Sequence, residues 1–175
     1  MTETEAKIIF VIGGARSGKS TFALAKAGTF PGKKAFIATA QPLDDEMKER
    51  IERHKAQRGR EWDTFEEPMK LARVLREIGP GYSAAVIDCL TLWLSNLLVS
   101  SEEIEEEVNA LLAFLKSGNF PTLFIVSNEV GMGIVPDNAL SRRFRDRAGV
   151  LNQQVAGIAD EVYLMAAGIP LRLKP

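Results

Sequence analysis

Short apolar runs alternate along this chain with longer segments in which apolar residues recur every three or four positions. The apolar runs predict strands at 7–12, 33–38, 84–88, 122–127 and 161–165, with a short last strand at 171–173. Helical spacing marks segments at 43–62, 101–116 and 140–158. Strands that alternate with helices are typical of a mostly parallel sheet covered on both faces. The pattern therefore predicts an α/β fold.

The first apolar run leads directly into a glycine-rich segment of the pattern G-x-x-x-x-G-K-S. Its residues are Gly13, Gly14, Ala15, Arg16, Ser17, Gly18, Lys19 and Ser20. Glycine lets backbone amides approach an anion closely, and a helix beginning near Gly18 adds its positive end. Lys19 would reach the outer phosphates, and the Ser20 hydroxyl would bind Mg²⁺. We interpret this as a phosphate-binding loop, the alternative being a strand–helix turn without a ligand.

A second element of a phosphate site lies at the end of the run at 84–88. Asp88 closes this run, and in open α/β sheets ligands bind at the carboxyl edge of the strands. A carboxylate there would help Ser20 to hold Mg²⁺. The alternative is that Asp88 caps the next helix, which begins around Thr91.

His54 is the single histidine, so any imidazole chemistry must use it. Met47, Ile51 and His54 are spaced i, i+4, i+7 and share one helix face, which favours a residue packed at the edge of the core. The alternative is a nucleophile that attacks phosphorus, with Lys55 and Arg58 neutralising the phosphate. Spacing alone leaves both interpretations open.

Composition narrows the class of protein. A chain of 175 residues with 46% hydrophobic and 26% charged residues is expected to form one globular domain over 1–175. A net charge of −1 argues against a nucleic-acid binder that works by bulk electrostatics. The single cysteine, Cys89, excludes an internal disulfide and is expected to be buried. No apolar run reaches the length of a membrane span and the first residues do not resemble a signal peptide, so we expect a cytoplasmic protein.

Four sequence blocks resemble a known family. They read GGARSGKS, FIATAQPLDDEMKERIERHK, VIDCLTLWLSNLL and VSNEVGMGIVPDNALSRRFRDRAGVLNQQVA. In these blocks the chain is similar to the adenosylcobinamide kinase/adenosylcobinamide-phosphate guanylyltransferase family of cobalamin biosynthesis. The resemblance extends from Ile8 to about Leu173. It implies a phosphate-loop domain, which we expect to be RecA-like in strand arrangement.

The resemblance implies two reactions on a small corrinoid substrate. In the first, ATP or GTP phosphorylates the hydroxyl of the aminopropanol arm of adenosylcobinamide. In the second, GTP guanylylates a histidine of the enzyme, pyrophosphate leaves, and the GMP passes to adenosylcobinamide-phosphate to give adenosylcobinamide-GDP. The family histidine falls on His54, which favours the nucleophile. A homotrimer with sites between subunits is also implied, and Mg²⁺ is expected because both reactions move polyphosphate charge.

The resemblance also implies nucleotide contacts outside the phosphate loop. They are Ala38, Thr39, Ala40, Lys55, Ala56, Gln57, Arg58, Glu66 and Asp88. Glu66 can accept hydrogen bonds from the guanine N1–H and amino group, which adenine lacks as a pair, so we expect it to select guanine. The alternative for Glu66 is a surface carboxylate.

Two groups of residues and three rival functions remain to be weighed. The glycine-rich segment 128–136 follows a strand and is expected at the same sheet edge. Arg142, Arg143, Arg145 and Arg147 form either a solvated basic face or contacts to phosphate and corrinoid.

Three other functions compete with the bifunctional enzyme. They are a small-molecule kinase without nucleotidyl transfer, a nucleotide-binding regulator, and an enzyme that has lost only its kinase half.

Overall fold

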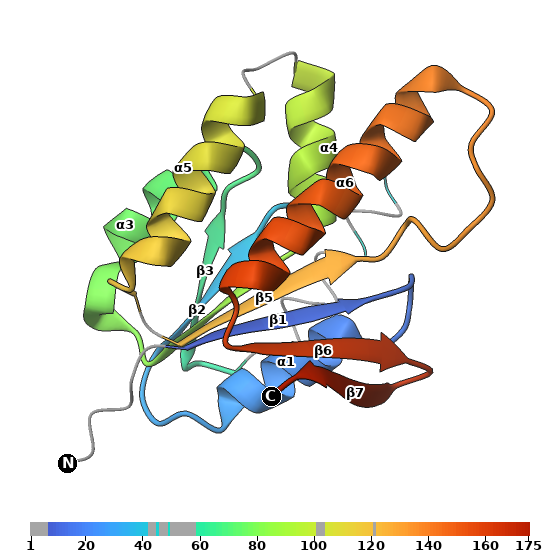
Figure 1. Cartoon of the computed structure of the whole chain (residues 1–175). Coiled ribbons are helices and arrows are strands. Elements are labelled where there is room, and N and C mark those ends of the chain that lie inside the picture. The colour runs from blue at the N-terminus through green and yellow to red at the C-terminus, as the bar shows by residue number, and fades with distance from the viewer. Residues whose placement is uncertain (1–6, 42–44, 46–48, 50–58, 101–103, 121) are drawn as a thin grey trace.

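The computed structural model describes residues 7–41, 45, 49, 59–100, 104–120 and 122–175 (Figure 1). Its strands are β1 (Ile8–Gly13), β2 (Lys34–Ala38), β3 (Trp62–Glu66), β4 (Ala84–Asp88), β5 (Thr122–Asn128), β6 (Glu161–Ala166) and β7 (Ile169–Lys174). Its helices are α1 (Lys19–Gly28), α3 (Leu71–Ile78), α4 (Leu90–Ser100), α5 (Ile104–Ser117) and α6 (Ala139–Ile158), with a 3₁₀ turn at Gly79–Gly81.

The strands form one seven-stranded sheet in the order β3-β2-β4-β5-β1-β6-β7. All neighbours pair in parallel except β6 and β7, which form an antiparallel hairpin at one edge. Strand β5 lies between β1, which leads into the phosphate loop, and β4, which carries Asp88. The predicted mostly parallel α/β fold is confirmed.

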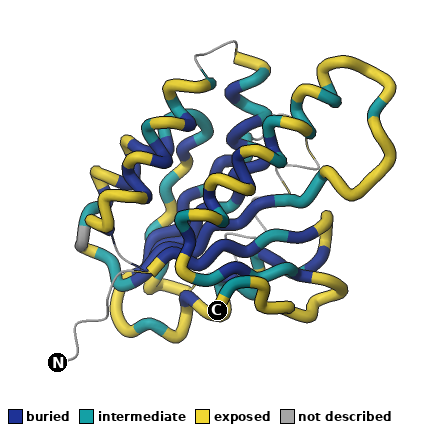
Figure 2. The backbone as a smooth tube through the Cα atoms, viewed as in Figure 1, coloured by how far each residue is buried: buried dark blue, intermediate teal, exposed yellow. Residues whose placement is uncertain are grey.

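Helices cover both faces of the sheet, as Figure 1 shows. Alternate residues of β1 divide between two cores: Ile8 and Phe10 face α3 to α6, whereas Ile9 and Val11 face α1. Strands buried on both faces are expected where helices cover both sides of a parallel sheet. Figure 2 shows this as a band of buried backbone through the centre of the molecule.

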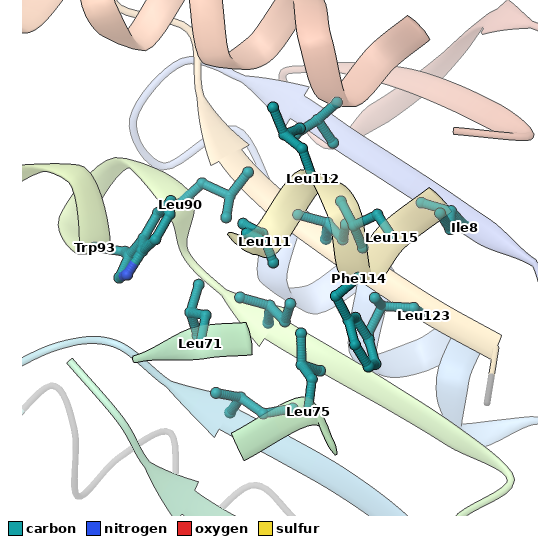
Figure 3. Close-up of a cluster of buried hydrophobic side chains, with 14 of the residues drawn as sticks. Ile8, Leu71, Leu75, Leu90, Trp93, Leu111, Leu112, Phe114, Leu115 and Leu123 are labelled. Atoms are coloured by element: carbon teal, nitrogen blue, oxygen red, sulfur yellow. The ribbon is translucent and has the colours of Figure 1, made fainter. Parts of the chain in front are cut away.

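The larger core lies under α3, α4 and α5 (Figure 3). Trp93 of α4 is fully buried there among Leu71, Leu90 and Leu111. Its indole N–H donates to the carbonyl of Met69 at 2.7 Å, so burial of the ring leaves no indole donor unsatisfied. Complete burial of a large apolar side chain stabilises the fold by about 1.5–3 kcal/mol.

The structure contains elements that the sequence pattern did not predict. Strand β3 is an edge strand in which Asp63 and Thr64 interrupt the apolar run, so only pairing with β2 establishes it. The sequence pattern does not predict helix α3 as a separate element, although its apolar residues do have helical spacing. The last strand, β7, is longer than the expected 171–173. Most of the helix expected at 43–62 lies outside the described residues, and its last residue, Trp62, begins β3 instead.

Candidate nucleotide-binding site

The phosphate loop connects β1 to α1 through conformations that favour glycine. Gly18, the N-cap of α1, has φ +94°, and Arg16 has φ +55°. A Cβ on Gly13 would lie 2.5 Å from the carbonyl oxygen of Met165 and 2.8 Å from Ser17 Oγ. The glycine at position 13 is therefore required by the close approach of β6, and that at 18 by its left-handed backbone.

Lys19 folds back over the loop. Its side chain is buried, and Nζ donates to the carbonyl of Gly14 and, at 3.3 Å, to Ser17 Oγ. Ser20, one residue further along, is half-buried in the first turn of α1. The ammonium group and the positive end of α1 thus lie at one loop, an arrangement that attracts an anion.

Neighbouring segments hold the loop on two sides. The N–H of Gly168, in the β6–β7 turn, donates to the carbonyl of Ser17 at 3.0 Å. The N–H of Glu129, just after β5, donates to the carbonyl of Gly13 at 2.9 Å. The loop is therefore built on the hairpin and on β5 as well as on its own helix.

Three further predicted residues end neighbouring strands at the same carboxyl edge. Ala38 of β2 lies opposite Glu66 of β3 on one side and opposite Asp88 of β4 on the other. At about 4.8 Å between neighbouring strands, Asp88 lies about 10 Å from the phosphate-loop strand, with β5 between them. The structure thus brings the phosphate loop, Asp88, Ala38 and Glu66 to one edge of the sheet.

Thr39 belongs to the frame of this edge. It is fully buried, and its hydroxyl donates to the carbonyl of Cys89 and accepts the Cys89 N–H, both at 2.8 Å. The side-chain amide of Asn96 donates to the Thr39 carbonyl at 2.8 Å. These bonds fasten the end of β2 beside Asp88. The neighbours Ala38 and Ala40 are half-buried.

Cys89 is buried as predicted. Burial, together with the neighbouring Asp88 carboxylate, raises the pKa of its thiol to about 11. The thiol therefore stays protonated at neutral pH and is a poor nucleophile.

Glu66 and Glu67 have different surroundings. Glu66 is exposed, whereas Glu67 is buried and accepts the N–H groups of Met69 at 2.9 Å and Lys70 at 2.8 Å. Arg73 donates to its other oxygen at 3.0 Å. Burial raises the pKa of Glu67, but these hydrogen bonds outweigh it and hold the pKa below its usual value. Sequence analysis did not single out Glu67, which lies just before α3, where it accepts the N–H of the N-cap residue Lys70.

The residues predicted to carry the second reaction lie outside the described residues. They are His54, Lys55, Ala56, Gln57 and Arg58.

The donors at this edge suit a hard cation. In the part of the chain that the structure describes, no three His, Cys, Asp or Glu side chains come together to hold a metal ion. Ser20 and Asp88 offer oxygen atoms, which Mg²⁺ prefers, and Mg²⁺ sites usually take only one or two protein ligands beside substrate phosphates and water. The two residues therefore fit an Mg²⁺ that enters with a nucleotide.

The arginines of α6 differ from one another in their partners. Arg142 donates to the carbonyls of Pro136, at 3.0 Å, and Asp137, at 2.6 Å, and so supports the loop before α6. Arg147 pairs with Glu105 of α5 at 3.0 Å. Arg143 is exposed. A solvated basic face therefore describes only part of this group.

Sequence analysis also missed a set of buried polar side chains behind the edge, namely Thr91, Ser127 and Asn152. A signal was present for one of them: Asn152 interrupts the apolar stripe between Leu151 and Val155 of α6.

Comparison with known proteins gives a consistent result. A family model described as cobinamide kinase / cobinamide phosphate guanyltransferase matches residues 9–173. The chain is 44% identical to the bifunctional adenosylcobalamin biosynthesis protein CobP of Pseudomonas aeruginosa, over 94% of this chain and 95% of that protein. It is 39% identical to the bifunctional adenosylcobalamin biosynthesis protein CobU of Salmonella typhimurium, over 95% and 99%.

Among solved structures, the RadB recombinase matches with a TM-score of 0.46 and 15% identity, over 90% of this chain and 73% of that one. A KaiC-like protein of Pyrococcus horikoshii matches with a TM-score of 0.48 and 14% identity, over 91% and 72%.

Proposed function

Because this chain belongs to the cobinamide kinase/cobinamide phosphate guanyltransferase family, we propose that it catalyses both reactions on adenosylcobinamide. In the first, the substrate hydroxyl attacks the γ-phosphorus of ATP or GTP, and a nucleoside diphosphate leaves. In the second, GMP is transferred from GTP to the phosphate just formed, and pyrophosphate leaves. The observation that carries the proposal is the buried Lys19 over a glycine loop, at the sheet edge that also carries Asp88.

The phosphate loop holds the polyphosphate in both reactions. Its amides and the positive end of α1 neutralise phosphate charge, and Lys19 moves from its contacts with Gly14 and Ser17 to the outer phosphates. Ser20 and Asp88 hold Mg²⁺, which supplies further charge neutralisation when bound. Catalysis of phosphoryl transfer is mostly positioning and electrostatics, which this arrangement of charges supports.

His54 is the proposed nucleophile of the second reaction. Its neutral imidazole attacks the α-phosphorus of GTP, a phosphorus–nitrogen bond forms, and the bond to pyrophosphate breaks. The phosphate of the corrinoid then attacks the same phosphorus and releases the imidazole. Lys55 directly follows His54 in the sequence and Arg58 lies four residues after it. Both are proposed to neutralise the attacked phosphate, with Ala56 and Gln57 beside them.

The test is covalent labelling with [α-³²P]GTP and Mg²⁺. The wild-type protein should gain an acid-labile label and a GMP-sized increase in intact mass. His54→Ala should gain neither, while still phosphorylating cobinamide. A label retained by His54→Ala would contradict the role of His54 as the nucleophile. A wild-type protein that phosphorylates cobinamide but forms no GMP adduct would be a kinase without nucleotidyl transfer.

Glu66 is proposed to select guanine, with Ala38, Thr39 and Ala40 lining the nucleotide. Its exposed carboxylate ends the strand next to β2, at the same edge as the phosphate loop. Glu66→Gln should reduce the preference for GTP over ATP in the labelling and phosphorylation assays, because a carboxamide accepts the paired guanine donors less well. An unchanged preference for GTP over ATP would mean that Glu66 is a surface carboxylate with no role in selecting guanine.

The corrinoid is proposed to bind where the segment 129–138 meets α6. Met132 and Ile134 are exposed on this segment, and the exposed Arg143 lies one turn into the helix. Apolar side chains beside a cation suit a large substrate that carries a phosphate. Arg143→Ala should raise KM for adenosylcobinamide-phosphate more than KM for adenosylcobinamide, as measured by initial rates.

A homotrimer is the proposed assembly. Edge strand β7 exposes Ile169, Leu171 and Leu173, and exposed apolar side chains of this kind mark contact surfaces. Light scattering after gel filtration should give three times the mass of the chain, and Leu171→Glu should lower the measured mass.

None of the helices among the described residues has the length and apolar character needed to cross a bilayer. One domain and a cytoplasmic location stay predictions.

A further inference from the structure

A closed circuit of hydrogen bonds lies behind the carboxyl edge of β5. The N–H of Asn128 donates to Thr91 Oγ1 at 2.6 Å, and Thr91 and Ser127 hydroxyls lie 3.2 Å apart. Ser127 Oγ donates to Asn152 Oδ1 at 2.7 Å. The Asn152 amide then donates to the carbonyl of Asn128 at 3.3 Å. The circuit therefore begins and ends on the backbone of Asn128.

The chemistry of the four groups fixes its direction. A hydroxyl has one proton, and that of Ser127 goes to Asn152, so Thr91 must be the donor to Ser127. Thr91 in turn accepts the Asn128 N–H. Thr91, Ser127 and Asn152 are 7%, 2% and 6% exposed, so water cannot easily replace a missing member. Loss of one hydroxyl leaves a buried donor or acceptor without its partner.

The circuit joins the three segments that set the geometry of the candidate site. Thr91 lies three residues after Asp88, in the first turn of α4. Asn128 ends β5, opposite Gly13 of the phosphate loop, and the next residue, Glu129, donates to the Gly13 carbonyl. Since β5 separates β1 from β4, the position of its end sets the spacing between the phosphate loop and Asp88.

We propose that this circuit positions the phosphate loop relative to Asp88, with the Thr91 hydroxyl as the positioning residue that joins the two sides. The inference rests on the proposed function, in which one nucleotide and its Mg²⁺ contact both. None of the circuit's side chains needs to touch the substrate. Its effect is expected on the affinity for the Mg²⁺-bound nucleotide and on kcat, with KM for the corrinoid unchanged.

Two substitutions at position 91 separate the hydroxyl from the shape of the side chain. Thr91→Val keeps the shape and removes the hydroxyl, whereas Thr91→Ser keeps the hydroxyl and removes a methyl group. The probe is a non-hydrolysable GTP analogue, titrated calorimetrically in Mg²⁺ and in EDTA. Initial rates with adenosylcobinamide and thermal unfolding complete the comparison.

Thr91→Val should weaken binding of the Mg²⁺-bound analogue about tenfold, and kcat should fall by a similar factor. In EDTA its affinity should change much less, because the spacing to Asp88 then matters less. Thr91→Ser should stay within about twofold of wild type in both assays, even where its melting temperature is lowered. This rescue by the hydroxyl is what a purely structural role would not produce.

The inference is overturned by equal losses in the two variants, or by a valine variant with lowered melting temperature but wild-type affinity and kcat. Should Thr91→Val fail to fold, Ser127→Ala breaks the same circuit. The affinity of Ser127→Ala for the GTP analogue in Mg²⁺ then tests the inference, and a wild-type affinity overturns it. A wild type that binds nucleotide but phosphorylates no cobinamide refutes the proposed function alone. The binding measurements on the position-91 variants still test whether the circuit positions the phosphate loop.

Discussion

The backbone N–H of Gly168 donates to the carbonyl of Ser17 at 3.0 Å, so the β6–β7 turn is hydrogen-bonded directly to the phosphate loop. A Cβ on Gly18 would lie 3.2 Å from the Cα of Gly168. The hairpin thus supports the loop from the side opposite β5. Substitutions that separate these two elements should disturb the loop before any nucleotide binds.

Gly13→Ala should destabilise the protein, because its Cβ would lie 2.5 Å from the Met165 carbonyl oxygen, which belongs to the sheet and cannot move aside. Overpacking of this kind costs about 1–3 kcal/mol. Gly14→Ala is the matched control: a Cβ at Gly14 meets nothing within 4 Å. Urea unfolding without nucleotide should show a loss for the first variant and little change for the second. Equal losses would contradict the packing of β6 against the loop.

Lys19→Met should lower kcat of cobinamide phosphorylation about 10²–10³-fold, because the loop loses the cation that stabilises charge on the transferred phosphate. Methionine fills a similar volume, so the only expected loss of stability comes from the two hydrogen bonds of Lys19 to Gly14 and Ser17, and the melting temperature should fall only slightly. Steady-state rates with ATP and with GTP measure the effect. A variant with more than a tenth of wild-type kcat would remove Lys19 from the reaction.

The parts of the fold that were predictable are those that a short stretch of sequence determines. The phosphate loop is one motif between a strand and a helix, and Asp88 ends an apolar run, so both were predicted in place. Strand β3 and the Glu67 carboxylate were not, because the first depends on pairing with β2 and the second on donors from three residues around it. The circuit through Asn152 joins residues up to 61 positions apart along the chain, and no local pattern describes it.

Trp93→Phe should lower the free energy of unfolding by about 1–3 kcal/mol, because it removes the indole donor and leaves the Met69 carbonyl unpaired in the core. The other tryptophan, Trp62, is half-buried in edge strand β3, so Trp62→Phe serves as the control and should cost less. Denaturant unfolding followed by far-ultraviolet circular dichroism suits both variants, since this signal does not depend on tryptophan fluorescence. A larger loss at Trp62 would contradict the central position of Trp93.

Glu67→Gln should destabilise the protein in a pH-dependent way. Folding lowers the pKa of Glu67, so the carboxylate's stabilisation is complete above its unfolded-state pKa of about 4.5 and is lost as the pH falls through the lower folded-state pKa. At pH 7 the substitution should cost about 1–3 kcal/mol, since glutamine would turn an N–H toward Arg73 or lose a backbone donor. Wild type and variant should converge as the pH falls below the unfolded-state pKa and through the lower folded-state pKa of Glu67. Glu66→Gln, at the exposed neighbouring position, should show no such convergence in urea unfolding from pH 3 to 8. A Glu67→Gln deficit that stays constant over that range would mean that the side chain acts through its shape, because only the charged form makes the bonds described here.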